Sequence, residues 1–110
     1  MPSRKESNQG ERNNYSLDFL PEVEGDSEEA FDWYESQRAG LGNEFFLAVD
    51  ECLNRIESNP LVFQKIFKEM RRALTRKFPF GVFFIVKEDA ITIIAIVHLV
   101  RHPKSWKKRG

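Results

Sequence analysis

Two histidines and an arginine stand where the last apolar segment of the chain ends. The stretch AIVHLVRHPKSW, from Ala95 to Trp106, places His98, Arg101 and His102 directly after a run of aliphatic residues. Histidine can act as a general acid or base because its ordinary pKa lies near neutrality, and arginine binds phosphate or carboxylate groups. The alternative for His98 is a structural role in the core. In a continued strand Arg101 would face away from both histidines, unless the strand ends before the following proline.

A second group of cations lies in the stretch MRRALTRKF, where arginine alternates with apolar residues. In an extended strand Arg72 and Arg76 would share one face, and Arg71 would lie on the other. Guanidinium groups in this pattern suit a phosphate or carboxylate partner. The alternative is an edge strand whose charges prevent aggregation.

The chain ends in a basic tail that contains Trp106. This indole could stack on a nucleic-acid base beside phosphate-binding charges, or fold back as an apolar cover over the sheet. The residues that we expect to bind a target or a nucleic acid are Arg71, Arg72, Arg76, Trp106, Lys107 and Arg109. We expect no metal or cofactor, because two histidines four residues apart and a distant Cys52 match no usual metal-site spacing.

Hydrophobic periodicity predicts the elements that position these residues. We expect a strand over 15–20, helices over 21–38 and 43–58, a loop over 63–67, and strands over 70–78, 81–87 and 91–100. Gly40 and Gly42 separate the two helices, and Asn43 is a candidate N-cap for the second. This β-α-α-β-β-β order predicts an α+β fold, with a helical hairpin packed on one face of a mostly antiparallel sheet.

The last two strands, VFFIV and ITIIAIVHLV, are apolar on both faces. A pair of helices covers only one side of a sheet. The second side must therefore be covered by the C-terminal tail, another chain or a ligand, because large exposed apolar patches usually mark interaction sites. The sequence thus predicts a partner.

Composition bounds the class of protein. The 110 residues suffice for one domain, predicted over 15–110 after a disordered arm over 1–14, and 41% of them are hydrophobic. No apolar run reaches the roughly 18–20 residues of a membrane span, and no secretory signal is recognisable. A lone cysteine fits a reducing compartment, so we expect a cytoplasmic protein.

The net charge of zero conceals two oppositely charged halves. Before Pro60 there are 5 Lys and Arg residues against 14 Asp and Glu, and from Pro60 onward there are 12 against 3. The division indicates a basic functional surface in the C-terminal half. The alternative is that acidic helices simply neutralise a basic sheet within the fold.

Four stretches in order carry a resemblance to a known family: LDFLPEVEGDSEEAFDWYE, GLGNEFFLAVDECLNRIESNP, RRALTRKFPFGVFFIV and IIAIVHLVRHPKSWKKR. Together they resemble the RelE/ParE toxins of bacterial type II toxin–antitoxin modules, over about Tyr15 to Arg109. The resemblance implies a cytoplasmic, growth-inhibiting toxin without a cofactor. It also implies neutralisation in a hetero-oligomer by a cognate antitoxin, whose C-terminal segment wraps the helices and sheet of the toxin.

The resemblance implies one of two activities. ParE-like members inhibit DNA gyrase, and the FPF stretch and the HLVRHPKSW ending are closer to these. RelE-like members cleave mRNA on the ribosome, which would assign catalytic roles to His98 and Arg101. However, Gly81 stands where the RelE pattern has an arginine, and the C-terminal tyrosine of that pattern is absent. We therefore expect a gyrase inhibitor, with a ribosome-dependent endonuclease or an inactive member that only binds antitoxin as alternatives.

Overall fold

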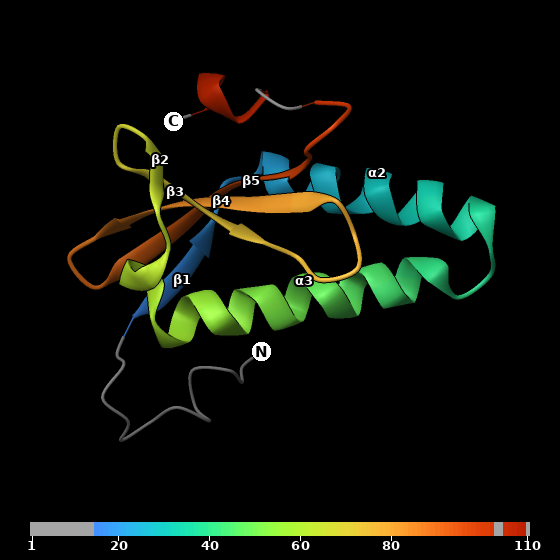
Figure 1. Cartoon of the computed structure of the whole chain (residues 1–110), viewed down its shortest axis with the longest axis horizontal. Coiled ribbons are helices and arrows are strands. Elements are labelled where there is room, and N and C mark those ends of the chain that lie inside the picture. Colours follow the sequence, from blue (N-terminus) through green and yellow to red (C-terminus); the bar gives the residue numbers. More distant parts are fainter. Residues whose placement is uncertain (1–14, 103–104, 110) are drawn as a thin grey trace.

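The computed structural model describes residues 15–102 and 105–109, so the predicted arm over 1–14 lies outside the described residues. The elements are β1 (Ser16–Phe19), α2 (Glu22–Gln37), α3 (Leu41–Ser58), the 3-10 turn η1 (Pro60–Val62), β2 (Lys65–Phe67), β3 (Met70–Leu74), β4 (Phe80–Lys87), β5 (Ala90–His98) and the 3-10 turn η2 (Ser105–Lys108). The strands form one sheet in the order β1-β5-β4-β3-β2 (Figure 1). β1 pairs parallel with β5, and the other neighbours pair antiparallel. The predicted α+β fold is confirmed.

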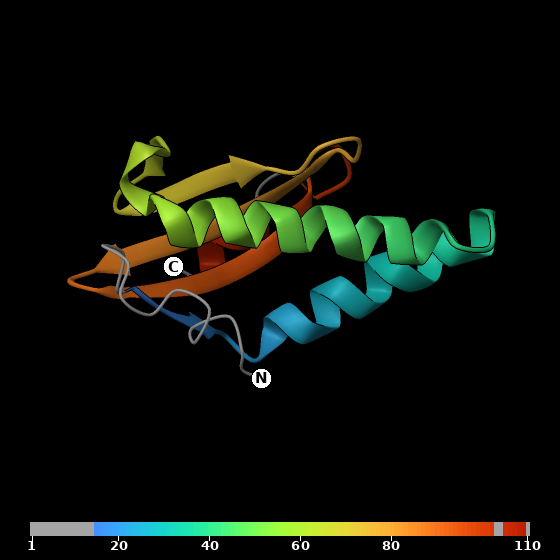
Figure 2. The same cartoon turned by 90° about the horizontal axis from the view of Figure 1, so that it is seen from below.

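The helices α2 and α3 form an antiparallel hairpin on one face of the sheet, which Figure 2 shows from below. The buried side chains of α3 recur at three- and four-residue steps, as in Phe45, Val49, Cys52 and Ile56. This spacing places them on one helical face, against the sheet. None of the helices in the described part of the chain is long and apolar enough to cross a membrane.

The turn between the two helices is capped differently from our expectation. α3 begins at Leu41, so Asn43 lies inside the helix and the prediction that it is the N-cap is wrong. The carboxylate of Glu35 instead accepts hydrogen bonds from the backbone N–H groups of Gly40 and Gly42, each at 2.9 Å. These bonds lower the pKa of Glu35. A Cβ atom at Gly42 would lie 2.6 Å from the ring of Phe31, so this position requires glycine.

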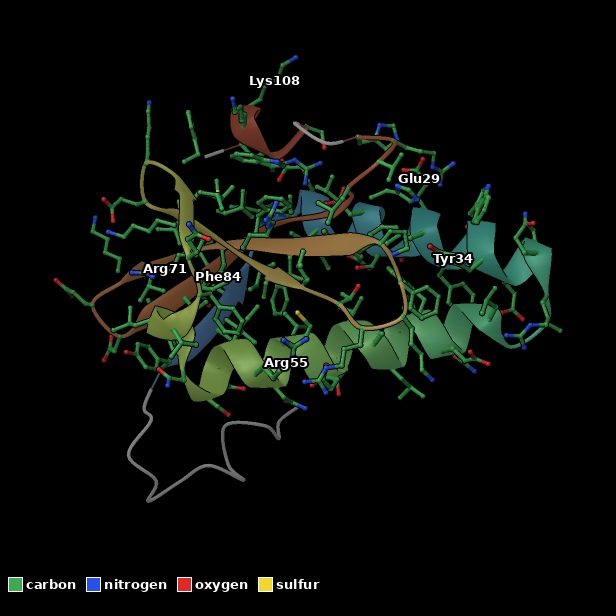
Figure 3. All side chains as sticks on the ribbon, viewed as in Figure 1. Glu29, Tyr34, Arg55, Arg71, Phe84 and Lys108 are labelled. Atoms are coloured by element: carbon green, nitrogen blue, oxygen red, sulfur yellow. The ribbon has the colours of Figure 1, made fainter. Side chains whose placement is uncertain are left out.

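An aromatic cluster forms the core between the helices and the sheet. The ring of Tyr34 lies 4.9 Å from that of Phe78, and Phe45 lies 4.8 Å from Phe80, measured between ring centroids. Figure 3 draws all described side chains and labels Tyr34 within this layer. Cys52 is completely buried here, and burial raises the pKa of its thiol to about 11. The single cysteine is therefore an inert core residue.

The opposite face of the sheet is covered in part by the tail of the chain. Its buried cluster consists of Met70, Phe83, Ile94, Ala95, Val97 and Trp106. The Trp106 ring is 6% exposed and stacks on Phe83, with centroids 4.8 Å apart and ring planes 15° apart. The sequence allows Trp106 either to reach outward to a nucleic-acid base or to fold back over the sheet, and in the structure it folds back over the sheet.

Three strand boundaries differ from the prediction. Lys65–Phe67, expected as loop, pairs as a short edge strand with β3. β3 ends at Leu74, because Thr75 turns the chain by donating from its hydroxyl to the carbonyl of Phe78 at 2.8 Å. β5 ends at His98, where a turn begins.

A β-bulge changes the facing of residues along β5. The register shifts where Phe83 pairs with Ala95 but Phe84 pairs with Ile93, which leaves Ile94 as an extra residue. Ile94 therefore joins the cluster under the tail, whereas Ile96 faces the helices. Simple alternation along the strand would place His98 on the same face as Ile94 and Ile96. Because of the bulge, His98 shares the helix-covered face with Ile96 but not with Ile94, so the expectation for Ile94 is wrong.

Candidate functional site

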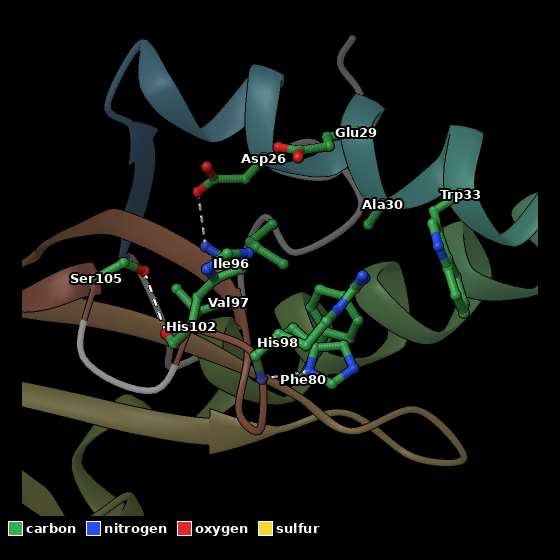
Figure 4. A pocket seen from close by; sticks show the side chains of 11 residues that line it. Asp26, Glu29, Ala30, Trp33, Phe80, Ile96, Val97, His98, His102 and Ser105 are labelled. Carbon is green, nitrogen blue, oxygen red and sulfur yellow. Dashed lines mark hydrogen bonds between the residues drawn. The ribbon is translucent and has the colours of Figure 1, made fainter.

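A pocket of about 120 Å³ opens where β5 ends beside α2 (Figure 4). It is lined by Asp26, Glu29, Ala30, Trp33, Phe80, Ile96, Val97, His98, Arg101, His102 and Ser105. The turn after His98 brings both histidines and Arg101 to the same hollow, which a continued strand would not do. The sequence-predicted group around His98 is thus one site, which we call the strand-end pocket.

His98 is held by the turn that it terminates. Its Nδ1 atom accepts hydrogen bonds from the backbone N–H groups of Val100 at 3.2 Å and Arg101 at 3.0 Å. Burial lowers the pKa of His98, and the charges of Arg101 and His102 lower it further. The imidazole is therefore neutral near pH 7, with only Nε2 available to another molecule.

Arg101 presents its guanidinium group over the ring of Trp33, at 4.8 Å from the ring centroid. Trp33 lies on α2 and is 43% exposed. Such a cation–π contact orients the guanidinium at little cost in solvation. Trp33 is not among the site residues predicted from the sequence, although a large aromatic residue outside the apolar face of a helix is a usable signal.

An ion pair ties the tail to α2 beside the same pocket. Arg109 donates from its two terminal nitrogens to the carboxylate oxygens of Asp26, at 2.7 and 3.1 Å, and also to the carbonyl of Ile94 at 3.2 Å. Asp26 also accepts a hydrogen bond from the backbone N–H of Ile96, at 3.0 Å, which Figure 4 shows. Asp26 and Arg109 therefore provide hydrogen-bond partners for the backbone N–H of Ile96 and the carbonyl of Ile94, at the part of β5 that lies beyond the end of β1. The hydrogen bonding of the Arg109 guanidinium to the Asp26 carboxylate is the main cause that raises the pKa of Arg109.

The arginines of the strand predicted over 70–78 do not gather at one site. Arg71 donates to the backbone carbonyls of Phe63, at 2.6 Å, and Leu61, and Arg76 lies 3.4 Å from the carboxylate of Glu51. Arg72 lies on the opposite face, with its stem beside Gly81. Arg71 and Arg76 thus stabilise turns of the fold, and neither lines the strand-end pocket.

The tail residues also divide between internal and exposed positions. Trp106 and Arg109 contact the body of the protein, as described above. Lys107 is exposed, with its ammonium group 5.0 Å from the ring centroid of Phe67. Of the target-binding residues predicted in the tail, Lys107 alone offers a solvent-exposed cation.

A groove between the two helices was not predicted as a site. It comprises two adjoining hollows of about 510 and 590 Å³, and both are lined by Phe46, Val49 and Leu53. Its apolar rim includes Phe19, 47% exposed, and Leu47, 69% exposed. The acidic residues on its edges are Glu24, Glu28 and Asp50. The sequence signal is Phe46-Leu47, which extends the apolar surface of α3 beyond its core face.

Comparisons with known proteins agree with this architecture. No family model matches the sequence. The fold is that of a chain from the chromosomal ParDE TA system from P. aeruginosa, with a TM-score of 0.69 at 17% identity over 76% of this chain and 95% of that one. The sequence is 31% identical to Toxin ParE2 of Mycobacterium tuberculosis over 84 residues, in two strains, covering 76% of this chain and 80% of the relative. The chain belongs to the ParE-like family of type II toxin–antitoxin toxins.

Proposed function

We propose that this protein is the toxin of a type II toxin–antitoxin module, that it inhibits DNA gyrase in the cytoplasm, and that a cognate antitoxin neutralises it. The observation that carries the proposal is the relationship to Toxin ParE2 over most of both chains. The state of the strand-end pocket supports binding rather than catalysis. Because Nδ1 of His98 accepts hydrogen bonds from the backbone, the neutral imidazole carries its proton on Nε2 and has no free lone pair to act as a general base. Asp26 is engaged by Arg109.

An RNA-cleaving enzyme would need a base for the 2′-hydroxyl, an acid for the leaving oxygen and cations for the phosphorane. For this reaction the sequence offers His98 and Arg101, together with Arg72 and Arg76 as further cations. Arg76 is paired with Glu51, and Arg72 lies on the other face of the sheet from His98. This dispersal favours the gyrase inhibitor over the endonuclease.

For the target contact we propose the strand-end pocket, with Arg101 on Trp33 as its centre. Purified toxin should inhibit supercoiling by purified gyrase or trap its cleavage complex. Arg101→Ala should weaken this inhibition, and Lys77→Ala, an exposed cation at the β3–β4 turn, should not. If transcripts are instead cut in a primer-extension assay with ribosomes, and His98→Ala abolishes the cuts, the endonuclease alternative is correct.

For the antitoxin contact we propose the groove between α2 and α3. An apolar groove with acidic edges fits an amphipathic segment that carries aliphatic anchors and flanking Lys or Arg. The antitoxin encoded beside the toxin gene should form a stable complex with the protein. Leu47→Glu on the rim should weaken the complex, whereas Glu88→Gln, at the distant β4–β5 turn, should leave it intact. A toxin that neither inhibits gyrase nor cuts transcripts, yet binds antitoxin, would be the inactive alternative.

A further inference from the structure

A third hollow lies away from both proposed contacts, at the β2–β3 and β4–β5 end of the sheet. It has a volume of about 460 Å³ and is lined by Phe67, Lys68, Glu69, Met70, Ile85, Val86 and Lys87. Its floor is apolar and is formed by Met70, which is 2% exposed, and by the half-buried Ile85. The volume lies within the range of about 300–1,000 Å³ typical of ligand sites. We call it the lysine hollow.

Two lysines line this hollow, and a third, Lys107, approaches the Phe67 ring that forms one of its walls. Lys68 and Lys107 place their Nζ atoms 5.3 and 5.0 Å from the ring centroid of Phe67, and Lys87 lines the hollow from the end of β4. Figure 1 shows the η2 turn of the tail beside the β2–β3 hairpin, which explains the approach of Lys107.

None of these three lysines has a close carboxylate partner among the described residues. None of the three forms an ion pair with a carboxylate of residues 15–102 or 105–109. Glu69, the acidic residue at the hollow, pairs with Lys65 at 3.0 Å. Lys68 also adopts a positive φ of 52°, which is uncommon for lysine. Like charges gathered around an apolar floor attract an anionic partner.

The chemistry of the floor favours a polypeptide over a nucleic acid. A base would need a free aromatic face on which to stack. The ring of Phe67 meets Trp106 edge to face, at 5.7 Å, and has two ammonium groups near it. The exposed part of Ile85 instead offers an aliphatic surface that suits a leucine or isoleucine side chain.

We propose that the lysine hollow binds an acidic polypeptide segment, which packs one large aliphatic side chain against Ile85, over the buried Met70. Carboxylates on either side of this anchor pair with Lys68, Lys87 and Lys107. The inference goes beyond the proposed inhibition of gyrase and does not depend on it, since it concerns a different surface.

The test is fluorescence anisotropy with a short fluorescein-labelled peptide in which two leucines are flanked on both sides by Asp and Glu. The triple variant Lys68→Glu, Lys87→Glu and Lys107→Glu should weaken binding roughly tenfold or more. The matched control is Lys77→Glu, an exposed lysine that also has a positive φ, at 72°, and it should bind normally. Replacing both leucines of the peptide by serine should weaken binding as well.

Three results would overturn this inference. They are no binding of the peptide, equal weakening by Lys77→Glu, and tighter binding of an oligothymidylate probe than of the peptide. Urea unfolding of the triple variant verifies that the substitutions leave the fold intact. Gyrase inhibition by the wild-type protein, without peptide binding, would reject the lysine hollow and leave the proposed function standing.

Discussion

The two faces of the sheet are covered by different means. On one face, α2 and α3 bury a continuous core around Phe45, Val82 and Ile93, all fully buried. On the other, η2 supplies a single large side chain, Trp106, and Arg109 anchors the end of the tail. A helix-covered face depends on many contacts, whereas a tail-covered face depends on very few. Single substitutions should therefore separate the two covers.

The largest effect is expected on the helix-covered face. Phe45→Ala should lower the free energy of unfolding by about 3–5 kcal/mol, because it leaves a cavity among packed aromatic rings. Urea unfolding followed by circular dichroism measures this loss. Leu47→Ala, on the same helix but 69% exposed, is the control and should change stability little. A small effect of Phe45→Ala would mean that the two faces are equally tolerant.

A smaller and more local effect is expected from Trp106→Ala. The variant should lose about 2–3 kcal/mol, toward the low end for buried aromatic residues, because the tail can detach instead of leaving a cavity. Hydrogen exchange should become faster at Val97 and its far-face neighbours, while α3 stays protected. Val100→Ala, 75% exposed, is the control. Uniform loss of protection across the molecule would contradict the division into two covers.

The ion pair of the tail should contribute less again. Its side chains are 16% and 23% exposed for Asp26 and Arg109, so the pair is partly screened by solvent. A double-mutant cycle with Asp26→Asn and Arg109→Gln should give a coupling energy of about 1–2 kcal/mol. The energies come from urea midpoints of the four proteins. Additive losses would show that the tail is held by Trp106 alone.

The smallest effect is a pH dependence at the strand-end pocket. Because the pKa of His98 lies below its ordinary 6.5, the unfolded chain binds this proton more readily than the folded one. The contribution of His98 to stability is therefore complete above about pH 6.5 and is lost as the pH falls below it. Urea midpoints between pH 7.5 and 5.5 should decline less in His98→Asn than in the wild type.

The sequence predicts the elements well where the pattern of burial is regular. α3 follows from the spacing of Phe45, Val49, Cys52 and Ile56, because one helical face is buried along its whole length. β4 and β5 follow from their apolar runs, and β3 follows from its alternation of arginine with apolar residues. β2 does not, because a strand of three residues carries too few positions to show alternation.

The candidate site was predicted only in part, for two physical reasons. The bulge at Ile94 inserts one residue, so counting by twos along β5 fails beyond it. Asp26 is one of several acidic residues on α2, and nothing local distinguishes the one that meets Arg109 more than eighty positions away. His98, Arg101 and His102 line one pocket because they are close in sequence and a turn follows His98. The separation of Arg71 and Arg76 from them depends on tertiary contacts that strand alternation does not encode.

The position of Arg109 gives enzymatic trimming a defined consequence. Cleavage of the chain between Lys108 and Arg109 would remove the guanidinium that pairs with Asp26, yet would leave Trp106 on Phe83. A preparation that is partly cleaved at this bond would thus contain two species that differ in how the tail is attached. Mass spectrometry of the intact protein is therefore the first check on any sample whose tail is studied.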